Sequence, residues 1–255
     1  MRFTVVIPAR FASSRLPEKP LLPIEGVPMV VRVAQQATQT EAERVVVATD
    51  HEAIAAVCKQ WGVEALMTRA DHPTGTDRLA EAAIALGLPD DAVVVNLQGD
   101  EPLMPPAVVD RVARALEEHP DCHIATAAHR IENVDAFFNP NVVKVTVDQR
   151  GQALTFSRAP MPWARDHFRD TKASLPADFP ALHHLGLYAY RAGFLKAYPT
   201  LAQCRLEQLE SLEQLRALYY GYRIAVETLD EPLPAGVDTA EDLERVRAEF
   251  ARRTR

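Results

Sequence analysis

Three basic side chains follow the first apolar run of the chain. The run ends at Pro8, and the next segment carries Arg10, Arg15 and Lys19. Ligands of open α/β sheets bind beyond the carboxyl ends of the strands, and guanidinium and ammonium groups hold phosphate oxygens well. Because the segment has neither a Walker nor a GxGxxG glycine pattern, these cations would supply most of the binding. The loop predicts a triphosphate site, and the alternative is an exposed loop with incidental charges.

Two aspartates follow later strand-like segments. Asp100 comes shortly after AVVVNL, and Asp238 lies between the last predicted strand and the last predicted helix. Magnesium prefers oxygen ligands and commonly takes one or two carboxylates, while phosphates and water complete its octahedron. Asp100 is therefore a candidate metal ligand at the sheet edge, and Asp238 is a candidate second ligand of the same metal. The alternatives are a turn that caps the next helix for Asp100 and a helix N-cap for Asp238.

A third candidate is the turn Thr74-Gly75-Thr76, which lies at the start of a predicted helix. Its hydroxyl and backbone N–H groups could bind an anion or read the edge of a nucleobase. The simpler alternative is that this turn only caps the helix.

A fourth group has the side chains that an acidic, polyhydroxylated sugar would need. It comprises Arg158, the pair His183-His184 with Tyr188, and Glu213-Gln214. A cation would bind the sugar carboxylate, and polar groups would bind its hydroxyls. Spacing does not show that these residues meet. On a leucine-spaced helix, Glu213 and Gln214 would by default face solvent.

Alternating strand and helix patterns are expected to position these residues. Buried parallel strands are predicted from short apolar runs at 3–8, 44–48 and 92–97. Helices are predicted at 28–38, 51–60, 76–86, 106–118 and 206–218, and from Thr239 onward. A β-hairpin is predicted at 142–156, a strand around Tyr188 and Tyr190, and a last strand at 223–228. The chain is thus predicted to be one α/β domain, 1–255, whose mostly parallel sheet is flanked by helices, with an antiparallel insertion at about 140–200.

The bulk composition restricts the class of protein. The 255 residues are 47% apolar and carry a net charge of −7, which offers no basic surface for nucleic acid. Three widely spaced cysteines without a CxxC pair favour buried thiols over a disulfide framework or zinc site. The first apolar run is too short for a signal peptide, and no run has the length of a membrane span. We therefore expect a cytoplasmic protein with no nucleic acid or membrane partner.

The motifs taken together resemble one known family. In order along the chain they are IPARFASSRLPEKPL, VATDHE, MTRADHPTGTDRLAE, VVNLQGDEP, FNPNVVKVT, FSRAPMPW, HHLGLYAYR, LEQLRAL and GVDTAEDLERVR. From the first strand to the last helix they resemble the 3-deoxy-manno-octulosonate (Kdo) cytidylyltransferases, also called CMP-Kdo synthetases. The first loop also occurs in other sugar nucleotidyltransferases, whereas its combination with LQGDEP, HLGLYAYR and LEQLR is much more specific.

The resemblance implies a fold, a reaction and an assembly. The fold would be the Rossmann-like nucleotidyltransferase fold with an antiparallel dimerisation insertion, and the protein would be a homodimer. CTP and Kdo would be the substrates and Mg²⁺ the cofactor. The product, CMP-Kdo, would serve lipopolysaccharide biosynthesis in Gram-negative bacteria.

Residue roles follow motif by motif from the same resemblance. The catalytic residues would be Arg10, Arg15, Lys19, Asp100 and Asp238, with both aspartates as metal ligands. The nucleotide would be bound by Ala9, Arg10, Arg15, Lys19, Thr74, Gly75, Thr76, Arg78, Gly99 and Asp100. The sugar would be bound by Gln98, Arg158, His184, Tyr188, Glu213 and Gln214. Relatives often carry glycine at the position of Glu18, a departure that could change loop flexibility but leaves the three cations in place.

The predicted reaction is nucleotidyl transfer, in which the anomeric hydroxyl of Kdo attacks the α-phosphorus of CTP and pyrophosphate leaves in line. Positioning and electrostatic stabilisation should dominate because both reactants are anionic, and no residue stands out as a general base. One alternative is the same chemistry on another acceptor, such as 8-amino-Kdo, sialic acid or a molybdopterin. Another is a non-catalytic nucleotide-sensing protein of the same fold, against which the acidic pair and the cationic loop both count.

Overall fold

The computed structural model describes residues 2–12 and 16–253, which form two compact units. The first unit contains Met1–Arg114, Ala189–Pro199 and Leu233–Arg255, and the second contains Ala115–Tyr188 and Thr200–Pro232. The antiparallel insertion expected at about 140–200 overlaps the second unit except at 189–199. Folding of the whole chain as one domain stays a prediction.

The first unit is built on a mostly parallel sheet. Its strands are β1 (Phe3–Ala9), β4 (Arg44–Thr49), β5 (Glu64–Met67), β6 (Val93–Asn96) and residues 189–191 of β10 (Leu182–Arg191). The strand order is β10-β6-β1-β4-β5; β1 is parallel to β4 and β6, and β4 to β5. The three apolar runs predicted as strands are confirmed, since buried parallel strands need apolar side chains on both faces. Sequence reasoning missed β5 because EALM is short and half-exposed.

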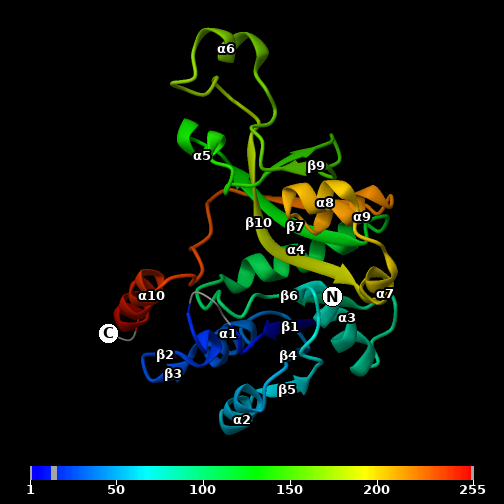
Figure 1. Cartoon of the computed structure of the whole chain (residues 1–255), viewed down its shortest axis with the longest axis vertical. Coiled ribbons are helices and arrows are strands. Elements are labelled where there is room, and N and C mark those ends of the chain that lie inside the picture. The colour runs from blue at the N-terminus through cyan, green and yellow to red at the C-terminus, as the bar shows by residue number, and fades with distance from the viewer. Residues whose placement is uncertain (1, 13–15, 254–255) are drawn as a thin grey trace. The chain divides into compact units, whose positions relative to one another are not determined.

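Helices accompany this sheet and the loops that follow its strands. They are α1 (Met29–Ala37), α2 (Glu52–Gln60), α3 (Gly75–Ala85), α7 (Ala192–Ala197), α10 (Ala240–Arg253) and α4 (Pro106–Glu118), of which α4 continues into the second unit. Shorter elements are the 3-10 turns η1 (Lys19–Leu21) and η2 (Tyr198–Thr200) and the hairpin of β2 (Pro23–Ile24) and β3 (Val27–Pro28). Figure 1 shows α2 against β5 at the edge of the sheet. Within residues 2–12 and 16–253, no helix combines the length and apolar character of a membrane span.

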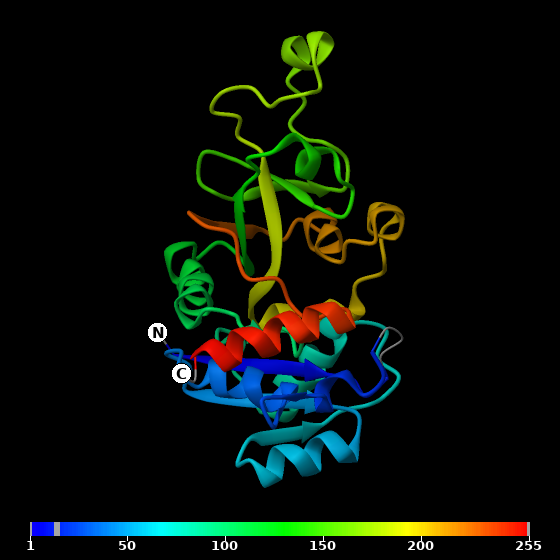
Figure 2. The same ribbon diagram turned by 90° about the vertical axis from the view of Figure 1, so that its left-hand side faces the viewer.

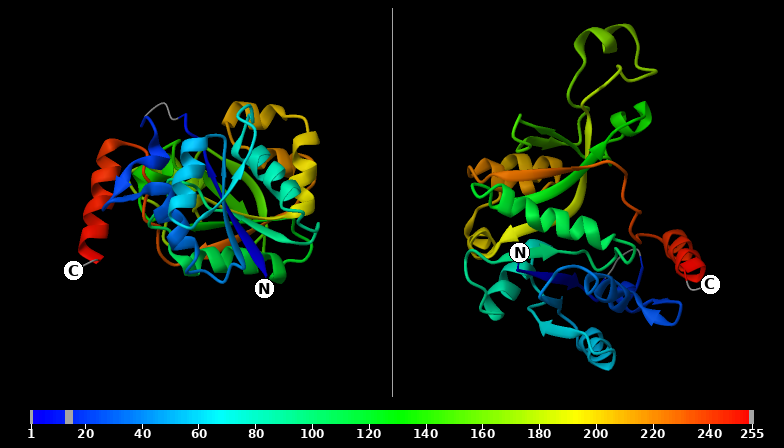
Figure 3. Two further views of the ribbon diagram at one scale, coloured as in Figure 1. Left: turned by 90° about the horizontal axis from the view of Figure 1, so that it is seen from below. Right: turned by 180° about the vertical axis from the view of Figure 1, so that it is seen from behind.

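An apolar core fixes the C-terminal helix of the first unit. Leu243 and Val246 of α10, together with the preceding Val237, pack against Ile24 and Met29. Figures 2 and 3 show α10 beside these N-terminal segments. The segment that carries Asp238 is therefore held by packing against residues from the start of the chain.

The second unit combines a parallel strand pair with an antiparallel hairpin. Strand β7 (Ile124–Arg130) is parallel to β11 (Ile224–Leu229), and β8 (Lys144–Val147) is antiparallel to both β9 (Ala153–Ser157) and β10. The predicted hairpin is confirmed, with Gly151 in its turn at a φ of 74°, where glycine is favoured. The helices are α5 (Val134–Phe138), α6 (Arg165–Asp170), α8 (Arg205–Glu210) and α9 (Gln214–Tyr219).

The prediction of one helix over 206–218 is wrong. Ser211 adopts a left-handed conformation, with a φ of 51°, and separates α8 from α9. Leu206 and Leu209 are exposed, whereas Leu212 and Leu215 are buried. A leucine at every third position therefore does not form one continuous apolar face here, because the chain turns in the middle of the repeat.

A buried ion pair joins α8 to α9. Arg216 donates from Nε to Oε2 of Glu207 over 2.8 Å and from Nη2 to Oε1 over 2.5 Å. Both side chains are about 5% exposed. Each helix has six residues, too few for independent stability, so the ion pair fixes the α8–α9 arrangement.

The three cysteines have the environment that their spacing predicted. Cys58, Cys122 and Cys204 are buried and free of disulfides. Burial raises the pKa of the Cys58 thiol to about 11, so this side chain behaves as a small apolar group at neutral pH.

Candidate active site

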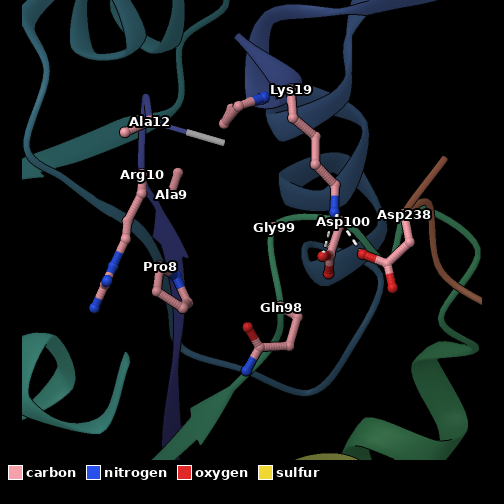
Figure 4. A pocket seen from close by; sticks show the side chains of 10 residues that line it. Pro8, Ala9, Arg10, Ala12, Lys19, Gln98, Gly99, Asp100 and Asp238 are labelled. Atoms are coloured by element: carbon pink, nitrogen blue, oxygen red, sulfur yellow. Dashed lines mark hydrogen bonds and ion pairs between the residues drawn. The ribbon is translucent and has the colours of Figure 1, made fainter. Parts of the chain in front are cut away.

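The ends of β1 and β6 and the loops after them line a pocket of about 280 Å³ in the first unit. The lining residues are Pro8, Ala9, Arg10, Ala12, Lys19, Pro20, Gln98, Gly99, Asp100 and Asp238. Figure 4 shows Lys19 directed at the two aspartates, while Arg10 points away from them. The strand-end rule thus brings together most of the residues predicted for the triphosphate and the metal. The predicted phosphate ligand Arg15 lies outside the described residues.

Lys19 forms ion pairs with both predicted metal ligands. Its Nζ lies 2.6 Å from Oδ2 of Asp100 and 3.3 Å from Oδ1 of Asp238. The lysine side chain is only 13% exposed, against 36% and 54% for the carboxylates. A cationic nitrogen thus lies between two carboxylates, and such oxygen donors suit a hard divalent cation. The residues present therefore fit a divalent metal.

A backbone contact holds the two aspartate loops together. The N–H of Val237 donates to the carbonyl oxygen of Asp100 over 2.9 Å. A Cβ at Gly236 would lie 3.1 Å from the same oxygen, so only a glycine fits without displacing its neighbour. Because Asp238 follows directly, this contact sets the position of its carboxylate relative to that of Asp100.

Helix α10 is capped by the residue after Asp238. The hydroxyl of Thr239 accepts from the N–H of Asp242, whose carboxylate accepts from the N–H of Thr239. These two reciprocal hydrogen bonds form a capping box. Since Thr239 is the N-cap, the side chain of Asp238 pairs with Lys19 instead.

Gly99 lies where the end of β1 approaches the loop after β6. A Cβ at this position would be 2.9 Å from the carbonyl oxygen of Pro8, closer than real Cβ contacts come. We expect Gly99→Ala to cost about 1–3 kcal/mol of stability and to lower kcat, because the loop that carries Asp100 must move. Urea unfolding and steady-state kinetics measure the two effects. Gly186→Ala is the matched control, since a Cβ there meets no atom within 4 Å; wild-type values for Gly99→Ala would contradict the close approach.

Glu101 is a buried acid beside this pair. Its Oε2 has no hydrogen-bond partner among the described groups. Burial, and then the charge of Asp100, raises the pKa of Glu101 to about 7 against the opposing effect of Lys19. At neutral pH it therefore adds less than a full negative charge. Sequence reasoning missed Glu101, although it stands next to Asp100 in the LQGDEP motif.

The loop after β1 is anchored to neighbouring loops. Arg10 donates from Nη2 to the carbonyl oxygen of His72 over 3.2 Å. The backbone N–H of Phe11 donates to Oδ1 of Asp50 over 3.3 Å, and its ring stacks on His51 with centroids 3.7 Å apart. Asp50 and His51 lie in the VATDHE segment, for which sequence reasoning assigned no role. They position the loop that carries the cations.

The residues predicted to surround cytidine lie at the start of α3. Thr74 caps this helix, because its hydroxyl accepts from the N–H of Asp77 and donates to the Asp77 carboxylate. Arg78 is completely buried and donates from Nη2 to Oδ2 of Asp50 over 2.8 Å. The helix-cap alternative thus describes Thr74. Nucleotide binding stays a prediction for Thr74, Gly75, Thr76 and Arg78.

The residues predicted for the sugar lie in both units. Gln98 lines the pocket of the first unit, and the second unit contains Arg158, His184, Tyr188, Glu213 and Gln214. Arg158 donates to the carbonyl oxygens of Glu210 and Pro140 over 2.7 and 3.1 Å. Gln214 is buried, so the default expectation that it faces solvent is wrong, and its Nε2 has no hydrogen-bond partner among the described groups. Sugar binding by this set stays a prediction.

A second pocket, of about 390 Å³, lies within the second unit. His129 and His183 line it, with Nε2 of the first 3.0 Å from Nδ1 of the second. Burial, and then the neighbouring His129 and Lys144, lowers the pKa of His183 to about 4. Of the side chains considered for the sugar, His183 lines this pocket, whereas Gln98, Arg158, His184, Tyr188, Glu213 and Gln214 are not among its lining residues.

His184 is buried and neutral. Its Nε2 lies 3.1 Å from the hydroxyl oxygen of Thr126, and its ring packs edge-on against Phe156. Burial, and then the neighbouring His183, lowers the pKa of His184 to about 3. At neutral pH the ring can therefore make hydrogen bonds but cannot supply the cation for a sugar carboxylate.

We expect acid to destabilise the fold through His184. Its folded-state pKa lies below the ordinary value of 6.5, so protons bind the unfolded chain first as the pH falls below 6.5, and stability declines down to about pH 3. Between pH 7.5 and 5 this linkage costs about 2 kcal/mol. Urea unfolding at both pH values measures this loss of stability. The loss should be about 2 kcal/mol smaller for His184→Asn than for wild type. The control His167→Asn, whose side chain is partly exposed, should lose as much stability as wild type. An unchanged pH dependence in His184→Asn would contradict this account.

Comparisons with known proteins extend these observations. Residues 4–224 match the cytidylyltransferase family. A solved structure of CMP:2-keto-3-deoxy-manno-octonic acid synthetase complexed with CTP has a TM-score of 0.90 and 39% sequence identity, covering 99% of this chain and 100% of that chain. A cytidylyltransferase from Leptospira borgpetersenii serovar Hardjo-bovis (strain JB197) has a TM-score of 0.61 at 15% identity, covering 98% and 87%, and is similar in fold alone.

The predicted fold and the predicted family are confirmed by these matches. The fold is α/β, with a mostly parallel sheet flanked by helices and a small antiparallel element, as in the synthetase structure. Nucleotidyltransferases of this kind typically use a divalent metal, which the carboxylate pair of Asp100 and Asp238 fits. Family match, fold and site agree: the chain belongs to the cytidylyltransferases and, among them, to the CMP-Kdo synthetase family.

Proposed function

We propose that this protein transfers CMP from CTP to Kdo and releases pyrophosphate. The observation that carries the proposal is the 39% identity, over 99% of the chain, with a CMP-Kdo synthetase complexed with CTP. The pocket at the ends of β1 and β6 supports it, because a cationic loop and two carboxylates meet there. That combination suits an anionic triphosphate accompanied by a metal ion.

The cationic loop is proposed to bind the triphosphate. Arg10, Arg15 and Lys19 would contact phosphate oxygens and stabilise the charge that develops on the leaving pyrophosphate. Ala9 and Gly99 would let the backbone approach the nucleotide, because both line the pocket and carry little or no side chain. The anomeric hydroxyl of Kdo would attack the α-phosphorus in line, and positioning supplies most of the rate enhancement.

Asp100 and Asp238 are proposed to hold Mg²⁺. When bound, the ion would polarise the α-phosphate and neutralise part of the triphosphate charge. The pair's preference for a cation is supported by the ammonium of Lys19, which contacts both carboxylates. The Val237–Asp100 hydrogen bond supports a shared site, because it keeps the two loops in contact.

Gln98, Arg158, His184, Tyr188, Glu213 and Gln214 are proposed to bind Kdo. The buried Nε2 of Gln214 supports this role, because a buried donor without a partner is costly and a sugar hydroxyl would satisfy it. Neutral His184 would bind a hydroxyl. The sugar carboxylate would then fall to Arg158, the only permanent cation of the set.

The proposal extends to assembly and cellular role. The family resemblance supports a homodimer, formed through the antiparallel segment at about 140–200, that supplies CMP-Kdo for lipopolysaccharide synthesis in the cytoplasm. Light scattering coupled to gel filtration tests the assembly, and the mass of a single chain at micromolar concentration would rule the dimer out.

Pyrophosphate release tests the proposed reaction. Purified protein with Mg²⁺ is incubated with CTP, ATP, GTP or UTP, each with and without Kdo. We expect pyrophosphate only when CTP and Kdo are both present. If the reaction with CTP and Kdo released no pyrophosphate, the proposal would be wrong. Parallel reactions with 8-amino-Kdo and sialic acid separate the acceptors, and equal or faster release with either would reassign the sugar.

A further inference from the structure

We propose that Lys19 has a second task besides phosphate binding. Without nucleotide, its ammonium takes the place of the divalent cation and keeps Asp100 and Asp238 in position, so the ammonium and the cation exclude each other. This role makes Lys19 a positioning residue for the metal site. The inference rests on the proposed function, specifically on a metal held by these two carboxylates.

The backbone delivers Lys19 to this place. Glu18 adopts a left-handed conformation, with a φ of 54°, directly before Lys19 opens the turn η1. The N–H of Lys19 donates to the carbonyl oxygen of Leu16, and its own carbonyl accepts from the N–H of Leu22, each over 3.2 Å. These backbone hydrogen bonds fix the main chain of Lys19, and its side chain is only 13% exposed. Lys19 therefore belongs to the wall of the pocket and is not a mobile surface lysine.

Charge explains why the two cations would exchange. One ammonium against two carboxylates leaves a negative charge uncompensated, and a divalent cation at the same oxygens would compensate both. An ammonium and a divalent ion held a few ångströms apart repel each other strongly at the low dielectric of a half-buried site. A metal ion alone must therefore displace Lys19 from its ion pairs, which weakens metal binding.

The triphosphate removes this conflict. Once phosphate oxygens are present, the released ammonium has an anionic partner and the metal can take both carboxylates. Metal and CTP should then strengthen each other's binding, since each makes the rearrangement that the other needs. Lys19 thereby disfavours metal loading of the empty pocket and favours loading together with nucleotide.

Titration of nucleotide-free protein with Mn²⁺, followed by electron paramagnetic resonance, tests this role. We expect Lys19→Gln to bind Mn²⁺ on the order of tenfold more tightly than wild type, whereas Lys19→Arg, which keeps the positive charge, stays close to wild type. Lys196→Gln is the matched control, because Lys196 pairs with Asp90 over 2.7 Å in the same unit without lining the pocket. Lys19→Met serves as a second neutral variant, and circular dichroism checks the folding of each.

In the presence of CTP the order of Mn²⁺ affinities should be reversed, so that Lys19→Gln binds Mn²⁺ more weakly than wild type. Unchanged or weaker Mn²⁺ binding by both neutral variants without CTP would overturn the inference. Asp100→Asn and Asp238→Asn distinguish failure of the proposed metal site from failure of the role of Lys19. If these variants bind Mn²⁺ like wild type, the proposed metal site itself is wrong. If they lose Mn²⁺ binding while the neutral Lys19 variants bind Mn²⁺ no more tightly than wild type, only the proposed role of Lys19 is wrong.

Discussion

Asp100→Asn and Asp238→Asn should each lower the rate of CMP transfer by about 10²-fold or more while leaving the fold intact. Each change removes a negative charge and a proposed metal donor at the place where the triphosphate charge is proposed to be stabilised. The carboxylates are 36% and 54% exposed, so stability should change by no more than about 0.5 kcal/mol. Pyrophosphate release at saturating CTP and Kdo measures the first effect, and urea unfolding the second.

Asp90→Asn is the control for these variants. Asp90 also pairs with a lysine, Lys196, but it is 80% exposed and does not line the pocket. Turnover of this variant should equal that of wild type. Near-normal activity in either pocket variant, across a range of Mg²⁺ concentrations, would remove that aspartate as a metal ligand.

Arg216→Met should lower the free energy of unfolding by about 3–5 kcal/mol. The change leaves the carboxylate of Glu207 buried without its cation, and it disconnects two helices that have six residues each. Because α9 begins with Gln214, a proposed Kdo ligand, the apparent affinity for Kdo should fall as well. Urea unfolding and the KM for Kdo measure these effects.

Two further variants isolate the buried charge as the cause. The double variant Glu207→Leu with Arg216→Met should recover part of the loss, since no unpaired charge is left. Arg44→Met removes an equally bidentate pair with Glu64 whose side chains are 42% and 45% exposed, and it should cost no more than about 1 kcal/mol. Equal losses in Arg44→Met and Arg216→Met would show that burial does not decide the effect.

The fold was predictable where apolar periodicity is strong. The runs at 3–8, 44–48 and 92–97 become β1, β4 and β6 because a parallel sheet covered on both faces needs such runs. Strand β7 was missed, since its segment IATAAHR is rich in alanine and ends in polar residues. The break at Ser211 was missed because the leucine spacing continues across it, and no local pattern reports the Glu207–Arg216 ion pair that joins the two helices.

The candidate site was predictable only in its components. The strand-end rule and the family resemblance together singled out Lys19, Asp100 and Asp238. Their mutual contact joins residues 81 and 219 positions apart, a distance over which spacing carries no information. The anchoring of the loop by Asp50 was missed for the same reason. Local chemistry thus identifies the groups, and the tertiary fold decides which of them pair.

The hydrogen bond between Val237 and Asp100 has a consequence for synthesis on the ribosome. One carboxylate of the pair comes from the middle of the chain, and the other precedes the final helix, α10, whose Leu243 and Val246 complete the core around Val237. A nascent chain can fold much of its sheet before this helix emerges, yet it lacks the second carboxylate in position. If Asp100 and Asp238 hold the metal as proposed, metal-assisted chemistry on CTP requires that α10 has been translated and has packed around Val237.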